Sequence, residues 1–232
     1  MTKIHISSQT GTMAVIVFES EDFLIADKPH GIPTVPLKGQ KPDATLLGLV
    51  SAQYPEVLSV CGRNPWEGGT CHRLDTATAG LVVFARTQAF YDYLQEIQLA
   101  DLFRKTYRAK TVENDSLKGS DIRIQDNREF QLVSYFRAYG KGSKAVRPVQ
   151  DIKRADSPVL YATEAIKNGE VFTCTITRGF RHQIRAHLAW IGHPIKGDCL
   201  YGTGSETDTL ELDCLKVQFP LPDGKPFFFA KN

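Results

Sequence analysis

The sequence contains no long apolar run. Nowhere in its 232 residues do apolar side chains approach the roughly 20 consecutive positions that a membrane-spanning helix requires. Residues 1–11 also lack a basic segment followed by an apolar core, which is the pattern of a secretory signal. We therefore predict a cytoplasmic protein without a membrane span.

Cysteine is scarce, and its spacing indicates no structural role. There are five cysteines, and no two lie within four residues of each other. A disulfide framework or a cysteine-rich zinc site has paired or closer spacing, so we expect free thiols. His182 and His187 are five residues apart instead of four, with no glutamate between them, and we predict no metal site.

The sequence also lacks internal repeats, low-complexity tracts and linkers rich in proline or serine. A length of 232 residues fits one large domain or two small ones. We predict a polar, flexible tail over residues 1–13 and a single domain over residues 14–232.

Hydrophobic periodicity predicts more strands than helices. Strand patterns cover residues 14–18, 23–27, 81–85, 104–112, 130–139, 159–166, 171–177 and 210–219. Helical patterns cover residues 43–54 with Asp43 as cap, residues 88–101 with Thr87 as cap, and residues 181–191 before Gly192. The pair Asn168-Gly169 predicts a tight hairpin. Strands in blocks with few helices between them indicate an α+β fold with a largely antiparallel sheet.

Residues 68–80 form the most informative segment, Gly-Gly-Thr-Cys-His-Arg-Leu-Asp-Thr-Ala-Thr-Ala-Gly. The paired glycines permit a tight turn, and Gly80 precedes an apolar strand. Between them, Arg73 and Asp75 lie on a segment without helical or strand periodicity. Polar loops on a rigid scaffold often carry reactive groups. A surface turn with capping side chains has the same composition, so both interpretations stay open.

A second polar segment is the predicted helix over residues 181–191. Ile184, Leu188 and Ile191 form its apolar stripe, and Arg185 lies next to that stripe. A partly buried guanidinium requires a carboxylate partner. Packing of this helix beside the Asp75 loop would provide one.

Tyr107 lies on a predicted strand, where it shares a face with Lys105 and Ala109. From the residues alone, Tyr107 can be a core side chain or can present its ring to a ligand.

Charge is unevenly distributed, although the net charge is only +2. Residues 137–154 contain one acid, Asp151, and six basic residues: Arg137, Lys141, Lys144, Arg147, Lys153 and Arg154. Such clustering can form a basic face that binds a polyanion. An ordinary solvated surface explains it equally well.

In their order and spacing, these segments resemble the RluA-type RNA pseudouridine synthases. The strongest similarity is His72-Arg73-Leu74-Asp75 followed by Thr78-Ala79-Gly80. Further similarities are Lys28-Pro29-His30-Gly31, Lys105-Thr106-Tyr107, His182-Gln183-Ile184-Arg185 with His187, Gly192-His193-Pro194-Ile195, and Gly197-Asp198 to Tyr201. The resemblance covers residues 14–229. It implies the pseudouridine synthase catalytic fold, with a mixed, mainly antiparallel sheet, a few flanking helices and an active-site cleft.

The resemblance also implies roles for individual residues. Asp75 would be the catalytic aspartate, and Arg185 would pair with it. Arg73 would enter the RNA helix where the target uridine has left, and Tyr107 would stack on the flipped base. In addition, we expect RNA contacts from His72, Thr76, His182 and Gln183 of these segments and, because of the clustered charge, from Lys141, Lys144 and Arg147.

The chain departs from the family pattern in several places. Many members have Gly-Arg-x-His-Gln where this chain has Gly179-Phe180-Arg181-His182-Gln183, so an arginine is displaced by one position and its contact is not carried over. The usual Thr-Ser-Gly is Thr78-Ala79-Gly80, and a late Leu-His-Ala is Leu212-Asp213-Cys214. There is no room before Ala14 for the small N-terminal RNA-binding domain of some members, so we expect the catalytic domain alone to select the RNA.

The implied reaction converts specific uridines of ribosomal or transfer RNA to pseudouridine. The bond from ribose to a uracil nitrogen breaks, the base turns, and a ring carbon forms the new bond. Nothing is oxidised and no group is imported, so we predict no cofactor. The reaction needs an anion that attacks the anomeric carbon or removes a proton from its neighbour, and Arg185 beside Asp75 would favour that anion. We expect a monomer that needs no protein partner.

Two other functions fit parts of the sequence. A glycoside hydrolase also acts at an anomeric carbon, but it normally uses two carboxylates that flank the bond. Glu67 is the other acid near Asp75, and it has no matching partner in the motif. An RNA-binding module without catalysis would not require an intact Asp75, Tyr107 and Arg185.

Overall fold

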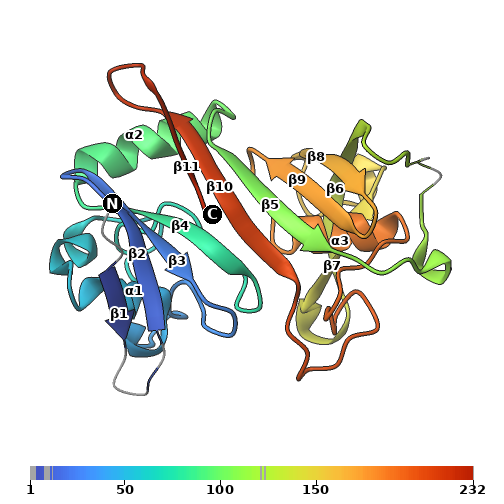
Figure 1. Cartoon of the computed structure of the whole chain (residues 1–232), viewed down its shortest axis with the longest axis horizontal. Helices are drawn as coiled ribbons and strands as arrows, with labels where there is room; N and C mark the ends of the chain where they lie inside the picture. Colours follow the sequence, from blue (N-terminus) through green and yellow to red (C-terminus); the bar gives the residue numbers. More distant parts are fainter. Residues whose placement is uncertain (1–3, 8–10, 12, 121, 123, 232) are drawn as a thin grey trace. The chain divides into compact units, whose positions relative to one another are not determined.

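The computed structural model describes residues 4–7, 11, 13–120, 122 and 124–231, and the chain divides into two compact units (Figure 1). Unit 1 comprises Met1–Phe103 and Cys214–Asn232, and unit 2 comprises Arg104–Asp213. Unit 2 is therefore one continuous segment, whereas unit 1 is assembled from two.

Strands dominate both units of the described chain. The strands are β1 (Ile4–Ser7), β2 (Met13–Glu19), β3 (Phe23–Lys28), β4 (Ala79–Ala85), β5 (Arg104–Lys110), β6 (Glu129–Tyr139), β7 (Ala145–Val149), β8 (Tyr161–Asn168), β9 (Val171–Ile176), β10 (Leu212–Pro220) and β11 (Pro226–Ala230). The α-helices are α1 (Leu46–Ser51), α2 (Gln88–Leu99) and α3 (Gln183–Trp190). Short 3-10 helices are η1 (Pro42–Ala44), η2 (Pro55–Ser59), η3 (Asp115–Leu117), η4 (Lys141–Ser143) and η5 (Ile152–Arg154). This composition confirms the predicted α+β class.

Unit 1 is built on a sheet in the order β1-β2-β3-β4-β10, with β11 paired to β10. The pairs β1–β2, β2–β3, β3–β4 and β10–β11 are antiparallel. All seven residues of β4 are buried, because its apolar sequence does not alternate and neither face meets solvent. Helix α2 contributes Phe90, whose ring stacks on Phe23 with 4.5 Å between centroids. Phe219 and Phe227 pack edge-on or tilted against Phe23 and against each other, which completes an aromatic core.

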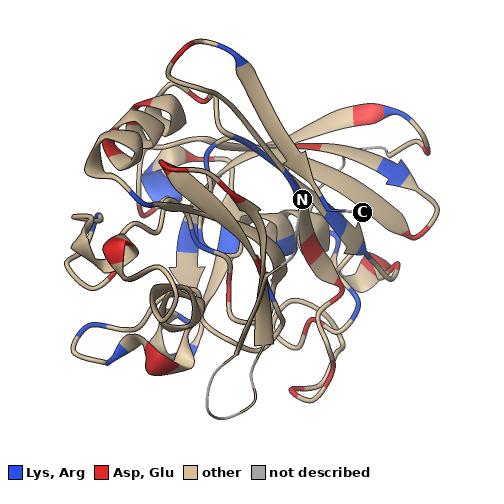
Figure 2. Cartoon of the chain, turned by 60° about the vertical axis from the view of Figure 1, so that its left-hand side comes forward, with Lys and Arg blue, Asp and Glu red and all other residues tan. Residues whose placement is uncertain are grey.

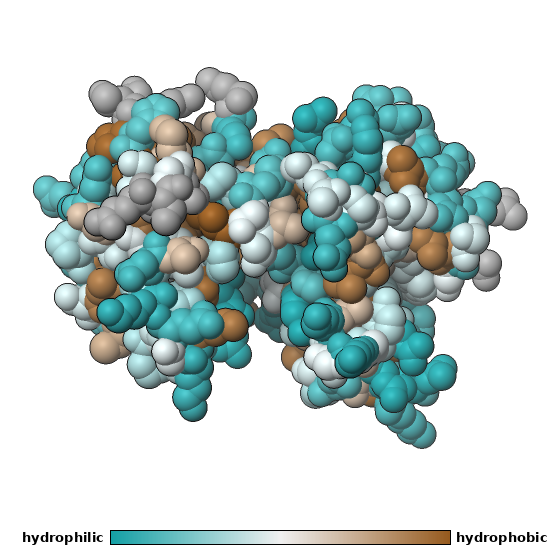
Figure 3. All heavy atoms as spheres, turned by 90° about the horizontal axis from the view of Figure 1, so that it is seen from below, coloured by the Kyte–Doolittle hydropathy of each residue, from teal (hydrophilic) through white to brown (hydrophobic). Residues whose placement is uncertain are grey.

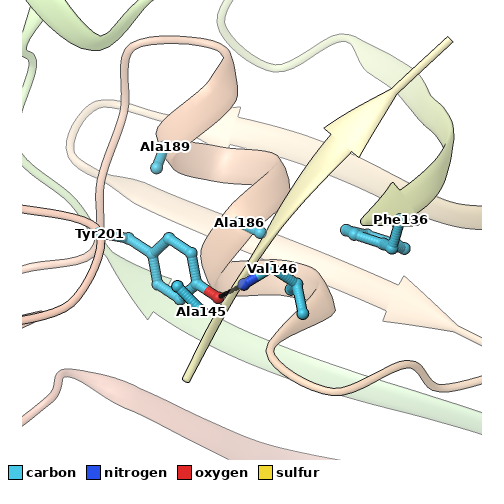
Figure 4. Close-up of a cluster of buried hydrophobic side chains, with 6 residues drawn as sticks. All are labelled: Phe136, Ala145, Val146, Ala186, Ala189 and Tyr201. Atoms are coloured by element: carbon cyan, nitrogen blue, oxygen red, sulfur yellow. Dashed lines mark hydrogen bonds between the residues drawn. The ribbon is translucent and has the colours of Figure 1, made fainter. Parts of the chain in front are cut away.

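Unit 2 is an antiparallel sheet in the order β5-β9-β8-β6-β7, with α3 packed against β7 and β8. Small side chains let the helix approach closely. Figure 4 shows the resulting cluster, which consists of Phe136, Ala145, Val146, Ala186, Ala189 and Tyr201. The hydroxyl of Tyr201 accepts a hydrogen bond from the N–H of Val146 at 2.8 Å, so the cluster contains no unsatisfied polar group at this point.

A buried histidine links α3 to the sheet of unit 2. His187 is fully buried, its Nε2 lies 2.9 Å from the hydroxyl of Ser134, and its Nδ1 lies 2.9 Å from the hydroxyl of Thr163. Gln183 also donates to Thr163 at 3.1 Å. Burial lowers the pKa of His187 to about 3, so the ring is neutral at physiological pH.

This histidine predicts an acid-sensitive stability. Between pH 6.5 and 3 the unfolded chain protonates His187 while the folded chain does not, so the free energy of unfolding falls as the pH falls. His187 alone lowers the free energy of unfolding by about 1.4 kcal/mol for each pH unit in this range. Urea denaturation from pH 7 to pH 5, above the range of most carboxylates, should show a shallower slope for His187→Gln than for wild type. Equal slopes in the two proteins would contradict this assignment.

Most predicted elements are found, and three strands were missed. Strand β1 shows that the predicted flexible tail is wrong for Ile4–Ser7, which pair with β2. Residues 1–3, 8–10 and 12 of that tail lie outside the described residues. Strand β7 lies within the basic stretch and contains Pro148, so its sequence does not resemble a strand. Strand β11 was missed because it is short and follows a turn. That residues 14–232 behave as one domain stays a prediction.

Two helix starts differ from prediction. Thr45, not Asp43, caps α1, because the Thr45 side chain accepts the N–H of Gly48 at 3.2 Å while residues 42–44 form a 3-10 turn. Helix α3 begins at Gln183 instead of Arg181, because His182 has the left-handed φ of 56°. Thr87 caps α2 as predicted.

The described chain has no helix of sufficient length and apolarity to cross a membrane. The face seen in Figure 3 is largely hydrophilic, with small apolar areas between. Acidic and basic residues occur on most elements (Figure 2).

Candidate active site

Asp75 lies at a turn that immediately precedes β4. The arm before it runs beside β4, where the N–H of Cys71 donates to the carbonyl of Val83 at 3.0 Å. The N–H of Thr78 donates to the carbonyl of Asp75 at 3.0 Å and closes the turn. Asp75 is half-buried, so its carboxylate has a fixed base in unit 1 and partial access to solvent.

Glycines flank this turn because no side chain fits there. Gly80 has φ +112°, and a Cβ added to it would lie 2.3 Å from the carbonyl oxygen of Cys214. A Cβ on Gly69 would lie 2.1 Å from the carbonyl oxygen of Ala85. Both ends of the Asp75 segment are therefore pressed against neighbouring backbone.

The segment after β3 holds the turn from its other side. The Nζ of Lys28 and the N–H of Gly31 both donate to the carbonyl of Thr76, at 3.2 and 2.9 Å. The Nδ1–H of His30 donates to the carbonyl of Ala77 at 2.7 Å. The two residues that follow Asp75 are thus fixed by three hydrogen bonds.

Lys28 brings a buried positive charge to this turn. It is 1% exposed and also donates to the carbonyls of Pro29 and Ile32, at 2.9 and 2.8 Å. Burial lowers the pKa of Lys28 to about 8, and the charge of Asp75 acts in the opposite direction by raising it. In the sequence, Lys28 stands out only as part of the segment Lys28-Pro29-His30-Gly31 that resembles the family. The available signal was a lysine directly at the end of an apolar strand, paired in register with Gly80.

Arg73 lies on the arm before Asp75 and forms an ion pair with Glu67. The NH1 of Arg73 is 2.8 Å from Oε1 of Glu67, and the two side chains are 59% and 6% exposed. Glu67, considered above as a second carboxylate for a hydrolase, is therefore engaged with a cation. Thr76, the other polar residue predicted to contact RNA at this turn, is exposed.

His72 has a local role in unit 1. Its Nε2 accepts the N–H of Val83 at 3.2 Å, and its ring packs edge-on against Phe103 at 5.2 Å between centroids. The ring therefore ties the arm before Asp75 to β4. The RNA contact predicted for His72 stays a prediction.

Tyr107 lies in unit 2 on β5, opposite Cys174 of β9. Lys105, Tyr107 and Ala109 are all buried, which confirms that they share one face of the strand. The Nζ of Lys105 donates to the carbonyl of Thr177 at 2.8 Å. Tyr107 is 6% exposed, which fits a core side chain as well as one whose ring meets a ligand.

Arg185 has a carboxylate partner that sequence analysis missed. Its Nε and NH2 groups donate to the two carboxylate oxygens of Asp198, both at 2.8 Å, and both side chains are buried. Asp198 also accepts the N–H groups of Leu200 and Tyr201, at 2.9 and 3.0 Å. The requirement of Arg185 for a carboxylate is thus met within unit 2. Its pairing with Asp75, a residue of unit 1, stays a prediction.

His182 and Gln183 stand at the start of α3. The Nδ1 of His182 lies 3.0 Å from the hydroxyl of Tyr201. The side chain of Gln183 is buried, donates to the carbonyl of Ala162 at 2.9 Å and accepts the N–H of Phe180 at 2.9 Å. Gln183 therefore supports the fold of unit 2, and its predicted contact with RNA stays a prediction.

Four of the six basic residues of the predicted polyanion face lie on the β6–β7 hairpin, and the other two, Lys153 and Arg154, lie on η5. Lys141, Lys144 and Arg147 are exposed, and Arg137 lies directly opposite Arg147 in the register of β6 and β7. The displaced arginine joins them, because NH2 of Arg181 donates to the carbonyl of Ser143 at 2.7 Å. Two arginines in direct cross-strand opposition destabilise a sheet unless an anion lies near them.

Within the described ranges, no three or more histidine, cysteine, aspartate or glutamate side chains are grouped so that they could hold a metal ion.

Comparisons with known proteins show which family the sequence matches. Residues 22–190 match a family described as RNA pseudouridylate synthase. The dual-specificity RNA pseudouridine synthase RluA of Vibrio vulnificus is 30% identical over 230 residues, which cover 96% of this chain and 84% of that protein. The ribosomal large subunit pseudouridine synthase D of Yersinia pestis is 30% identical over 188 residues, which cover 81% of this chain. The chain spans only about half, 52%, of the length of that relative.

A solved structure shows the same fold. The human RNA pseudouridylate synthase domain containing 1 superposes with a TM-score of 0.65 at 19% identity, over 94% of this chain and 82% of that one.

Proposed function

Because the chain belongs to the RNA pseudouridylate synthase family, we propose that it isomerises specific uridines of ribosomal or transfer RNA to pseudouridine without a cofactor. The observation that carries this proposal is the Asp75 turn, which is fixed on both sides and lies next to the buried charge of Lys28. The RNA classes are those in the names of the relatives. We propose that the protein acts as a cytoplasmic monomer.

Asp75 supplies the anion that the reaction requires. It either attacks the anomeric carbon of the target nucleotide or removes a proton from the neighbouring carbon, while the bond from ribose to uracil nitrogen breaks. The hydrogen bonds to the carbonyls of Thr76 and Ala77 hold the turn in place during that step. Such positioning lowers the barrier because the reacting group is already oriented.

The target base must leave the RNA stack before Asp75 can reach its sugar, which costs a few kcal/mol. We propose that Arg73 fills the vacated place and that Tyr107 stacks on the flipped base. Stacking on an aromatic ring is worth about 1–3 kcal/mol per base and offsets much of this cost. The exposure of Arg73 supports its role. Within unit 2, Asp198 holds the guanidinium of Arg185.

The β6–β7 hairpin is proposed to contact the RNA backbone. The opposed pair Arg137 and Arg147 supports this, since phosphate would relieve the repulsion between them. Lys141 and Lys144 extend the positive charge along the turn of the hairpin.

Changing Lys141, Lys144 and Arg147 together to alanine should weaken binding to target and non-target RNA alike, because phosphate contacts carry little sequence information. Each neutralised phosphate contributes about −0.7 to −0.9 to the slope of log affinity against log salt. With two to four contacts in the whole basic stretch, its share of the slope is roughly −2 to −3, and the triple variant should lose part of that share. Affinity measured over a salt series gives the answer, and parallel lines of equal affinity would assign the hairpin to ordinary solvated surface. The rate at saturating RNA should not change.

The proposed activity is tested directly with the purified protein and transcribed ribosomal and transfer RNA in the presence of EDTA. Pseudouridine should form without added metal or nucleotide. Absence of product with both RNA classes would overturn the proposed function, and activity that depends on one added metal would overturn the cofactor-free mechanism. Mapping pseudouridines in RNA from a strain without this protein then identifies the uridine.

A further inference from the structure

Glu67 is a buried carboxylate whose main partner is an exposed arginine. Its Oε1 accepts from NH1 of Arg73 at 2.8 Å and from Nδ2 of Asn64 at 3.1 Å. The Glu67 side chain is 6% exposed, whereas that of Arg73 is 59% exposed. The carboxylate is therefore held in the protein while most of the guanidinium side chain faces solvent.

The loop that carries Glu67 has little freedom to move. Gly62 is so close to Gly68 that an added Cβ would lie 2.3 Å from the Gly68 carbonyl oxygen. Gly68 has φ +51°, a conformation that favours glycine. The loop is also tied to α2, because the N–H of Arg63 donates to the hydroxyl of Tyr91 at 2.7 Å. Glu67 is thus a fixed point two residues before the paired backbone at Gly69.

Breaking the ion pair would cost the buried carboxylate of Glu67 more free energy than it would cost the exposed Arg73, because water can solvate only the arginine well. If Arg73 swung away, Glu67 would keep only the neutral amide of Asn64, and a buried charge without an ionic partner is strongly unfavourable. Arg73 uses only NH1 in the ion pair, and a guanidinium has five N–H donors in a fixed plane. The arrangement restrains the arginine without consuming its capacity to donate.

We infer that Glu67 is a positioning residue that holds Arg73, ahead of RNA binding, in the orientation in which it replaces the flipped uridine. This inference rests on the proposed function. An unrestrained arginine must be ordered when RNA binds, and that ordering lowers affinity for the flipped state. Glu67 removes this cost in advance because its own loop is rigid.

A double-mutant cycle tests the inference. Glu67→Gln keeps the shape of the side chain but removes its charge, and Arg73→Gln removes the guanidinium. In the presence of Arg73, Glu67→Gln should lower kcat/KM on transcribed RNA about 3- to 10-fold, as expected for one side chain that loses its preorganisation. In the Arg73→Gln background the same change should alter kcat/KM less than about twofold, because Glu67 then has no arginine to hold. If the two residues acted independently, Glu67→Gln would lower kcat/KM by the same factor in both backgrounds. Glu67→Asp, which keeps the charge, should recover part of the loss.

Base flipping provides a readout that a purely structural role would not change. A short RNA with 2-aminopurine beside the modified uridine should show a smaller fluorescence rise with Glu67→Gln than with wild type, at equal bound fraction. The exposed Glu96→Gln on α2 is the control and should match wild type.

The outcomes separate the inference from the proposed function. Equal losses from Glu67→Gln in both backgrounds would overturn the positioning role, and so would a neutral Glu67→Gln beside a strongly impaired Arg73→Gln. A neutral Arg73→Gln in an active enzyme would also overturn it, while leaving the pseudouridine synthase activity intact. Only an inactive wild-type protein would count against the proposed function itself.

Discussion

Replacing Asp75 with asparagine should reduce turnover to below roughly one hundredth of wild type, while affinity for RNA stays within a few-fold. Asparagine has nearly the same shape and can keep the turn, in which the backbone carbonyl of residue 75 accepts from Thr78. It has no negative charge and can neither attack the sugar nor accept a proton from it. Pseudouridine formation under single-turnover conditions and RNA affinity by filter binding give the two values.

Asp43→Asn is the matched control for this change. Asp43 is an exposed aspartate of the same unit, and its loss of charge should leave the rate unchanged. Turnover by Asp75→Asn above about one per cent of wild type would exclude Asp75 as the essential group. A loss of RNA binding as large as the loss of turnover would instead assign it to substrate recognition.

Replacing Arg185 with alanine should destabilise the protein by about 3–5 kcal/mol, because Asp198 would then be a buried charge without its cationic partner. The two N–H groups of Leu200 and Tyr201 would still bond to Asp198, but they carry no full charge. Arg185→Lys should recover only part of the stability, since an ammonium cannot make the planar two-point contact. Urea denaturation of each variant measures the free energy of unfolding.

Arg108→Ala provides the comparison, because Arg108 is an exposed arginine on β5 of the same unit. Arg108→Ala should change the free energy of unfolding by less than about 0.5 kcal/mol. An Arg185→Ala protein as stable as Arg108→Ala would show that the pair with Asp198 contributes little. Arg185→Lys should stay folded, so the activity of this variant relative to wild type measures the contribution of the guanidinium to catalysis apart from its contribution to stability.

Local sequence patterns predicted the elements whose signals lie within a few residues. The apolar run of β4, the cap Thr87 of α2 and the Asn168-Gly169 hairpin are all of this kind. Strand β7 was missed because its polar residues and Pro148 give no clear alternation, and only pairing with β6 makes it a strand. Asp43 was preferred to Thr45 as a cap because the 3-10 turn at residues 42–44 leaves no periodic signal.

In the candidate site, too, sequence patterns identified residues with local signals and missed the contacts between segments. Motif spacing identified Asp75 and Arg185 as residues of interest, since both stand in distinctive local segments. It did not identify Asp198, 13 residues further along the chain, as the partner of Arg185, or Lys28 as a neighbour of Asp75, because each contact joins two separate segments. A requirement such as a partner for a buried guanidinium is visible in a sequence, but the choice among several carboxylates is made by the three-dimensional fold.

The discontinuity of unit 1 sets an order for synthesis on the ribosome. Arg104–Asp213 emerges as a whole before Cys214, so unit 2 has all of its own strands while unit 1 still lacks β10 and β11. The backbone against which Gly80 is pressed, at Cys214, is not yet made when the Asp75 segment leaves the ribosome. The nascent chain therefore carries its complete Asp75 motif for more than a hundred residues of elongation before the surface that supports the end of that motif exists. The Asp75 turn is therefore translated before unit 2, and the end of its motif acquires its final packing only after Cys214 is made.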